Sequence, residues 1–269
     1  MKILALDSSG LVASVAVVED DGVNSSLLAE YTVNYKKTHS QTLLPMLDEI
    51  ARMIELDLNT IDAIAVAAGP GSFTGLRIGS ATAKGLGLAL DKPLVHVPTV
   101  DALAYNLYGT DRAICPLMDA RRNQVYTGIY EFRNNELSVI EPQMAVGIEV
   151  IAGKLRALGR EVVFLGDGVP VFRKALMEEL MQGMDFSFAP AHLNKQRAGA
   201  VAALAVSYVR AGKIETAAEH RPDYLRPSQA ERERAEKEAR EKAEKAKAEK
   251  AERVEKEKAE EQKEAGLHE

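Results

Sequence analysis

The chain has 269 residues, 46% of them hydrophobic, which is enough for one or two domains with a real core. Lysine and arginine number 34 against 40 aspartates and glutamates, and the formal charge of -6 argues against whole-molecule attraction to nucleic acid or anionic membranes. A single cysteine, Cys115, excludes an intrachain disulfide and a cysteine metal cluster, and its apolar neighbours predict a core thiol. With no apolar run of signal-peptide or membrane-span length, we expect a soluble, cytoplasmic protein without a membrane partner.

The predicted elements repeat in one order. Strands are expected at 3–6, 12–18, 27–33, 61–68 and 94–97, with helices from His39 to about residue 54, at about 75–90 and at 99–108. From residue 113 the pattern returns, with strands at 114–118, 125–132, 137–140, 162–165 and 186–188 and helices at 148–158, 170–182 and 196–211. Two βββαβαβα units predict an internal duplication, with α/β domains at 1–110 and 111–227 that meet at a cleft.

The composition changes after Pro227. Residues 228–269 are rich in Glu, Lys, Arg and Ala and lack a heptad of apolar residues, so a coiled coil is disfavoured. Acid-first pairs four residues apart, such as Glu238 and Lys242, favour a solvated, partly helical tail over an electrostatic tether for another macromolecule.

A glycine-rich run joins the strand at 61–68 to the next helix. Gly69-Pro70-Gly71-Ser72-Phe73-Thr74-Gly75 lies where a phosphate loop would, but no Gly-Lys pair follows it and the Rossmann spacing fails at Thr74. Within the helix, Gly75, Gly79, Ala83 and Gly87 recur every four residues and form one stripe. Such a stripe lets another backbone approach closely, either in a partner protein or in the protein's own sheet.

Asp7 and Asp119 end the first strands of the two repeats. Two carboxylates facing a cleft could hold Mg²⁺ and phosphate oxygens, with Ser8 beside the first. The alternative, of equal weight, is that each carboxylate caps its own hairpin turn.

The remaining candidates for chemistry are few. The five histidines, at positions 39, 96, 192, 220 and 268, have no second His or Cys within metal-ligand spacing, so no local metal site is predicted. Gly-x-Ser-x-Gly is absent, because the Gly71–Gly75 segment is one residue too long for a nucleophile elbow.

Several segments resemble one family, the bacterial tRNA threonylcarbamoyladenosine biosynthesis protein TsaB. The resemblance covers residues 1 to about 227 in order, its most specific part is the glycine run, and the tail lies outside it. The segments that carry it are Ile3–Ser9, Thr38-His39-Ser40, Leu43-Leu44-Pro45, Gly69–Gly79, Asp119-Ala120-Arg121, Val125-Tyr126 and Tyr224-Leu225-Arg226.

The resemblance implies a duplicated actin-like ATPase (ribonuclease-H-like) fold and a non-catalytic paralogue of the transferase subunit TsaD. The catalytic relative carries a His-x-x-x-His metal motif where this chain has Thr99 to Leu103, and its nucleotide loops are reduced here to Gly166-Asp167-Gly168. We therefore expect no catalytic residue, no metal and no cofactor, with Asp7, Ser8 and Asp119 as vestigial nucleotide candidates.

The same resemblance implies a scaffolding subunit that holds a TsaD-like partner competent to modify the adenosine beside the anticodon of tRNAs. A TsaE-like ATPase would join the assembled complex, two copies could pair through the same helices, and contact with tRNA would be indirect. The residues predicted to meet the partner are Leu43, Leu47, Ile50, Gly75, Gly79, Ala83 and Gly87. On this hypothesis Gly79→Leu abolishes partner binding and leaves the fold intact, whereas a damaged fold would mean that the glycines pack on the protein's own sheet.

Two alternatives remain. The chain could be an ATP·Mg²⁺-dependent enzyme of the actin-like superfamily that uses Asp7 and Asp119. Alternatively, Arg121, Arg122 and basic residues of the tail could touch tRNA, which would make binding steeply salt-dependent.

Overall fold

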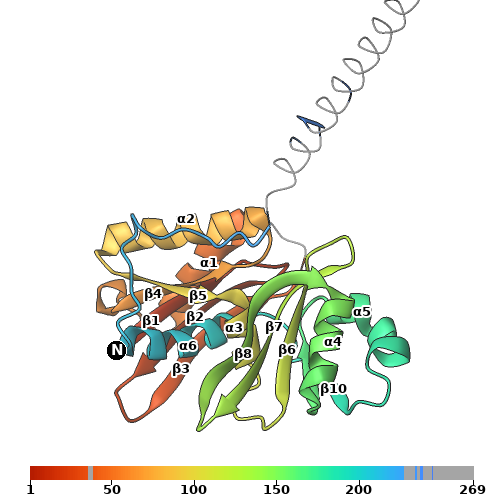
Figure 1. The fold of residues 1–269 in the computed structure, drawn as a ribbon. Helices are drawn as coiled ribbons and strands as arrows, with labels where there is room; N and C mark the ends of the chain where they lie inside the picture. Colours follow the sequence, from red (N-terminus) through yellow and green to blue (C-terminus); the bar gives the residue numbers. More distant parts are fainter. Residues whose placement is uncertain (36–38, 227–233, 235–236, 239–243, 245–269) are drawn as a thin grey trace, which may run out of the picture. The chain divides into compact units, whose positions relative to one another are not determined.

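The computed structural model describes residues 1–35 and 39–226, together with residues 234, 237–238 and 244 (Figure 1). Met1–Leu225 form one compact unit, which ends before Arg226. The predicted tail at 228–269 and Thr38 lie almost entirely outside the described residues. None of the described helices combines the length and the apolar character needed to cross a membrane.

The first repeat builds a five-stranded sheet in the order β3-β2-β1-β4-β5. Its strands β1, β2 and β3 are antiparallel neighbours, and β1, β4 and β5 run parallel. The elements are β1 (Lys2–Asp7), β2 (Ala13–Asp20), β3 (Ser25–Val33), α1 (His39–Met53), η1 (Leu58–Thr60), β4 (Ala63–Gly69), α2 (Phe73–Leu90), β5 (Leu94–Pro98) and α3 (Thr99–Tyr105).

The second repeat builds a sheet with the equivalent order, β8-β7-β6-β9-β10. Again the first three strands are antiparallel and the later two are parallel to the first. The elements are β6 (Ala113–Asp119), β7 (Gln124–Arg133), β8 (Glu136–Gly147), α4 (Ile148–Leu158), β9 (Val162–Leu165), α5 (Val169–Ala175), η2 (Leu176–Leu180), β10 (Phe186–Phe188) and α6 (Ala198–Arg210). The duplicated α/β fold predicted from the sequence, with two βββαβαβα repeats, is confirmed.

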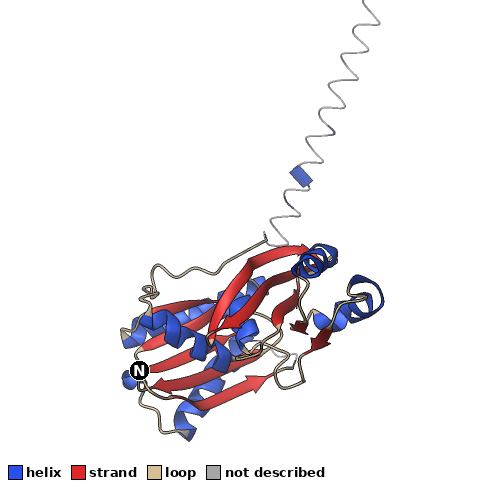
Figure 2. Ribbon diagram, turned by 60° about the horizontal axis from the view of Figure 1, so that its bottom comes forward, coloured by secondary structure: helices blue, strands red, loops and turns tan. Residues whose placement is uncertain are grey.

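Helices cover the sheets on both faces (Figures 1 and 2). On the first sheet, α1 and α2 lie side by side on one face, over a core that includes Leu4, Leu6 and Ile64. The opposite face is covered by α6, whose Val201 and Ala205 pack against Ile3 and Ala5. Because side chains alternate along a strand, β1 serves both cores.

The last helix of each repeat reaches the other repeat. Val100 and Leu103 of α3 pack against Ile114 and Tyr130 of the second sheet, and α6 packs across the first sheet. The predicted second domain, residues 111–227, contains the whole second sheet. Its helix α6 and its residues 215–223, however, pack on the first sheet. This exchange links the two sheets within the compact unit of residues 1–225.

Cys115 is buried in this interior, and burial raises the pKa of its thiol to about 12. The thiol is therefore protonated and unreactive at neutral pH, as predicted for a core cysteine.

Candidate functional site

The glycine run lies directly on the turn that follows β1. Ser72 caps α2, because its side chain accepts a hydrogen bond from the Gly75 amide, and the Ser72 amide donates to the Ser9 carbonyl at 2.7 Å. A Cβ atom at Gly75 would overlap the carbonyl oxygen of Ser8, and one at Gly71 would overlap that of Ser9. These glycines are therefore required for close backbone packing inside the chain.

Gly69 serves the other side of the run. Its φ of +122° favours glycine, and a Cβ there would overlap the Asp223 carbonyl oxygen. The Asp223 amide donates to the Ala68 carbonyl at 2.7 Å. The run is thus enclosed between the β1 turn and the C-terminal segment of the compact unit.

Asp7 and Asp119 make the same local hydrogen bond in the two repeats. Asp7 Oδ1 accepts from the Ser9 amide at 2.9 Å, and Asp119 Oδ1 accepts from the Arg121 amide at 2.8 Å. Each carboxylate therefore caps its own turn, which is the second of the two roles predicted for Asp7 and Asp119. Within the described part of the chain, no side chain bridges the carboxylates of Asp7 and Asp119 by hydrogen bonds or ion pairs.

Asp7 and Ser8, the candidate nucleotide-binding residues of the first repeat, are shielded from solvent. Asp7 is 1% exposed, and burial raises the pKa of its carboxyl to about 6. Ser8 is also buried, and its hydroxyl donates to the Gly75 carbonyl at 2.9 Å. A phosphate could reach these side chains only after the glycine run moved.

Two polar atoms near this turn lack a partner. The Nδ1 of His39 and the Nε2 of Gln196 are buried and make no hydrogen bond, although Nε2 of His39 lies 2.9 Å from the Gly10 carbonyl oxygen. The amide of Gln196 lies next to Gly10. These atoms could bind an ordered water or a small polar ligand.

The seven residues predicted to meet a partner lie inside their own chain. A Cβ at Gly79 would overlap the Ser8 hydroxyl, and one at Gly87 would press on Leu94 and Lys92. The stripe packs on the protein's own sheet, which is the alternative that the sequence left open, so Gly79→Leu is expected to damage the fold. The seven buried residues are Leu43, Leu47, Ile50, Gly75, Gly79, Ala83 and Gly87.

The opposite faces of α1 and α2 are the ones that solvent reaches. Leu88 of α2 is 72% exposed, and a Cβ at Gly85 would meet open space. The α2 sequence contains no acidic residue, and the exposed positions between its ends include Thr74, Arg77 and Ala81. On α1, Leu44 is 52% and Met53 74% exposed. We call the exposed residues of α1 and α2 the outer helix face.

An aromatic pair stands at the start of this face. The rings of Phe73 and Tyr224 are 4.7 Å apart, and the Arg77 guanidinium lies 5.5 Å from the Phe73 ring. Both rings are partly exposed. Tyr224 of the C-terminal segment therefore lies beside the outer helix face, at the first turn of α2.

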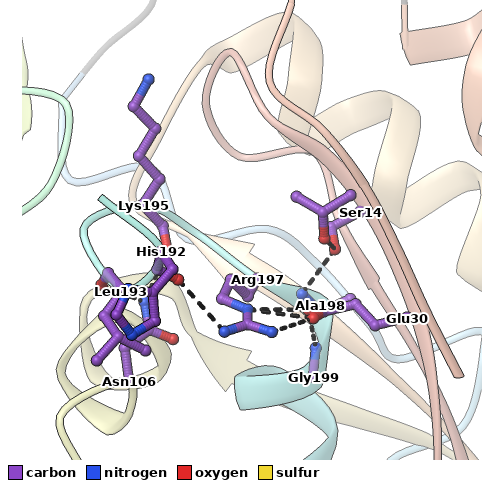
Figure 3. Close-up of polar contacts among 10 residues, drawn as sticks. Ser14, Glu30, Asn106, His192, Leu193, Lys195, Arg197, Ala198 and Gly199 are labelled. Carbon is purple, nitrogen blue, oxygen red and sulfur yellow. Dashed lines mark hydrogen bonds and ion pairs between the residues drawn. The ribbon is translucent and has the colours of Figure 1, made fainter. Parts of the chain in front are cut away.

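Where the chain passes from the second sheet into α6, hydrogen bonds and an ion pair hold it in place (Figure 3). Glu30 of β3 pairs with Arg197 and accepts from the Gly199 amide at 3.0 Å, and Ser14 of β2 accepts from the Ala198 amide at 2.9 Å. On the other side, the Asn106 amide donates to the carbonyls of Leu193 and Lys195. The orphan amides at the α6 N-terminus are therefore capped by residues far away in sequence.

Comparison with known proteins matches the chain to tRNA-modification proteins. Residues 26–234 match the family model described as TsaD: tRNA N6-adenosine threonylcarbamoyltransferase. The tRNA threonylcarbamoyladenosine biosynthesis protein TsaB of Bacillus subtilis is 35% identical over 234 residues, 86% of this chain and 96% of that protein. The chain belongs to the TsaB family, within the wider family that this model describes.

Other TsaB relatives agree. The Escherichia coli TsaB is 33% identical over 171 residues, which is 62% of this chain and 72% of that protein. The solved structure of YeaZ from Pseudomonas aeruginosa is 27% identical and superimposes with a TM-score of 0.70 over 83% of this chain and 99% of that one. The family predicted from the glycine run and its companion segments is confirmed.

Within this TsaB-family chain, one side-chain cluster escaped the sequence analysis. His96, Glu215 and His220 come together beside β5, although 124 residues separate the two histidines. The only local signal was Thr216 with Glu219, the spacing of a capping box that folds His220 back over Glu215. Nothing in the sequence links that turn to β5.

Proposed function

We propose that this chain is a non-catalytic subunit that binds a TsaD-like transferase and supports threonylcarbamoyl transfer to tRNA adenosine. Membership of the TsaB family supports a part in tRNA threonylcarbamoyladenosine biosynthesis. The observation that carries the finer proposal is the outer helix face, where an exposed α2 offers Gly85, Ala81 and Leu88 with no acidic side chain. Arg77 is the one charged side chain at the exposed positions of α2, whereas solvated helices ordinarily carry several charged residues on that side.

The proposed contact is helix on helix. Small residues at Ala81 and Gly85 allow a partner helix to approach α2 closely, and Leu88 with Leu44 and Met53 supplies apolar anchors around them. A TsaE-like ATPase would join through the assembled complex, and a second copy of this chain would compete for the same face. Contact with tRNA would then run through the partner.

The closed β1 turn supports the absence of independent catalysis. Asp7 and Ser8 are buried beneath the glycine run and are hydrogen-bonded to neighbouring groups. An ATP·Mg²⁺-dependent enzyme needs a carboxylate open to the metal and phosphates. The unpartnered atoms of His39 and Gln196 are the observation that favours this second candidate, since a small polar ligand would satisfy them.

One experiment separates the two. The chain is mixed with a purified TsaD-like subunit, and the mass is followed by light scattering, while ATP hydrolysis by the chain alone is assayed with Mg²⁺. We expect a heteromeric complex and no turnover by the isolated chain. Turnover by the chain alone, or no complex at micromolar concentrations, would contradict the proposal.

A further inference from the structure

The residues His96, Glu215 and His220 form a cluster that the proposed function does not use. Their ligand atoms all lie within 4.8 Å of one another. Glu215 Oε1 lies 2.6 Å from Nδ1 of His220 and 3.8 Å from Nδ1 of His96. Two imidazoles and one carboxylate are a donor set that Zn²⁺ favours.

The backbone fixes where these side chains stand. His96 lies on the edge strand β5, on the same side as Leu94, which packs toward α1 and α2. Glu215 pairs with Leu94 through two backbone hydrogen bonds of 2.8 and 2.9 Å. The Thr216–Glu219 turn then brings His220 over Glu215, because the His220 amide donates to the Thr216 carbonyl.

A second carboxylate orients the outer histidine. Asp223 Oδ2 lies 3.0 Å from Nε2 of His96, which directs Nδ1 of the same ring toward Glu215. A carboxylate on the far nitrogen of a metal-bound histidine is the usual way in which proteins fix the tautomer of a ligand. The cluster therefore has both a set of donors and an orienting partner.

The exposure of the three side chains also fits a bound ion. The His220 side chain is fully buried, while the side chains of His96 and Glu215 are 27% and 25% exposed. An ion could enter from the exposed side, and one coordination position would stay open to water. Donor atoms around Zn²⁺ lie about 3.3 Å apart, so small side-chain rotations suffice.

We propose that His96, Glu215 and His220 bind a Zn²⁺ ion that fastens residues 215–223 to the edge of the first sheet. On binding, lone pairs of Glu215 and His220 turn onto the ion in place of the hydrogen bond between them. The ion thereby holds Asp223 and Tyr224 against Gly69 and Phe73 at the start of α2. The competing explanation is a hydrogen-bond network without metal.

The test is Zn²⁺ titration of the chelator-treated full chain by calorimetry, combined with thermal unfolding with and without Zn²⁺. We expect one Zn²⁺ per chain at this site and a higher melting temperature when it is bound. His96→Gln should lower the Zn²⁺ affinity by about 100-fold, and Asp223→Asn by about 10-fold. His192→Gln, which removes an exposed histidine outside the cluster, should leave both readouts unchanged.

Equal Zn²⁺ affinity in the unaltered chain and in His96→Gln would overturn the proposal, as would a loss of affinity in His192→Gln of the same size. Circular dichroism checks the fold of His96→Gln. If that variant does not fold, Asp223→Asn decides, because the Asp223 side chain is 46% exposed and its removal leaves the interior untouched.

Discussion

At Asp7, burial and hydrogen bonding act in opposite directions on the carboxyl group. Burial raises its pKa from 3.8 to about 6, and the bonds from the Ser9 amide and hydroxyl offset only part of that rise. The folded state therefore holds the Asp7 proton more tightly than the unfolded state does. The packing of the glycine run therefore holds the Asp7 carboxyl group in the interior, and the group does not lie in a solvent-accessible site.

Asp7→Asn should change how stability depends on pH. In the unaltered chain, the contribution of Asp7 is fully present below pH 3.8 and is lost as the pH rises through about 6. Asparagine removes this loss, so the free energy of unfolding of the variant, relative to the unaltered chain, should rise by about 2 kcal/mol between pH 4.5 and pH 7.5. Urea denaturation at the two pH values measures it.

Asp21→Asn is the matched control. Asp21 lies in an exposed turn, where hydrogen bonds from the Asn24 and Val23 amides lower its pKa, so its stabilising contribution is lost as the pH falls. Between pH 4.5 and pH 7.5 Asp21 is almost fully ionised in both the folded and the unfolded state, so its replacement should leave the pH dependence over this range nearly unchanged. A pH-independent difference between Asp7→Asn and the unaltered chain would contradict the burial of an ionisable Asp7.

The N-terminus of α6 depends on side chains from the first sheet. Glu30, whose side chain is 10% exposed, pairs with Arg197 and accepts from the Gly199 amide. Glu30→Ala leaves that helix end and the Arg197 charge unpaired, and should lower the free energy of unfolding by about 2 kcal/mol.

Glu49→Ala serves as the control for Glu30→Ala. Glu49 also pairs with an arginine, Arg52, but on the exposed surface of α1, so its loss should change stability by at most about 0.5 kcal/mol. Both are measured by urea denaturation. Equal effects of the two substitutions would show that the contacts of Glu30 at the start of α6 stabilise the fold no more than a surface ion pair does.

On α2, the sequence predicted the helix but not its orientation. The four-residue stripe of Gly75, Gly79, Ala83 and Gly87 has a second apolar and small-residue face opposite it, with Ala81, Gly85 and Leu88. A periodic pattern identifies the inner face only when the outer face is clearly polar, and here Thr74 and Arg77 are its only polar exposed residues. The contacts with Ser8 and Leu94 decide the orientation, and they involve strands that sequence spacing does not place.

Across the whole molecule, hydrophobic periodicity was enough for the two βββαβαβα repeats, whereas turn capping by Asp7 and Asp119 was one of two alternatives that the sequence left open. It did not predict that α6 packs on the first sheet or that residues 215–223 return to β5. Those placements follow from long-range packing in which Ala and Val of α6 fit the face of β1. For the same reason nothing in the sequence predicts that His96 of β5 lies beside His220.

The central claim is that the outer helix face binds the TsaD-like transferase. Gly85 on α2 and Gly153 on α4 are both exposed helical glycines at which a Cβ meets open space, so leucine at either should preserve the fold and slightly favour the helix. Calorimetry with the transferase subunit should show at least about 100-fold weaker binding for Gly85→Leu and unchanged binding for Gly153→Leu. Unchanged affinity of folded Gly85→Leu would contradict the claim.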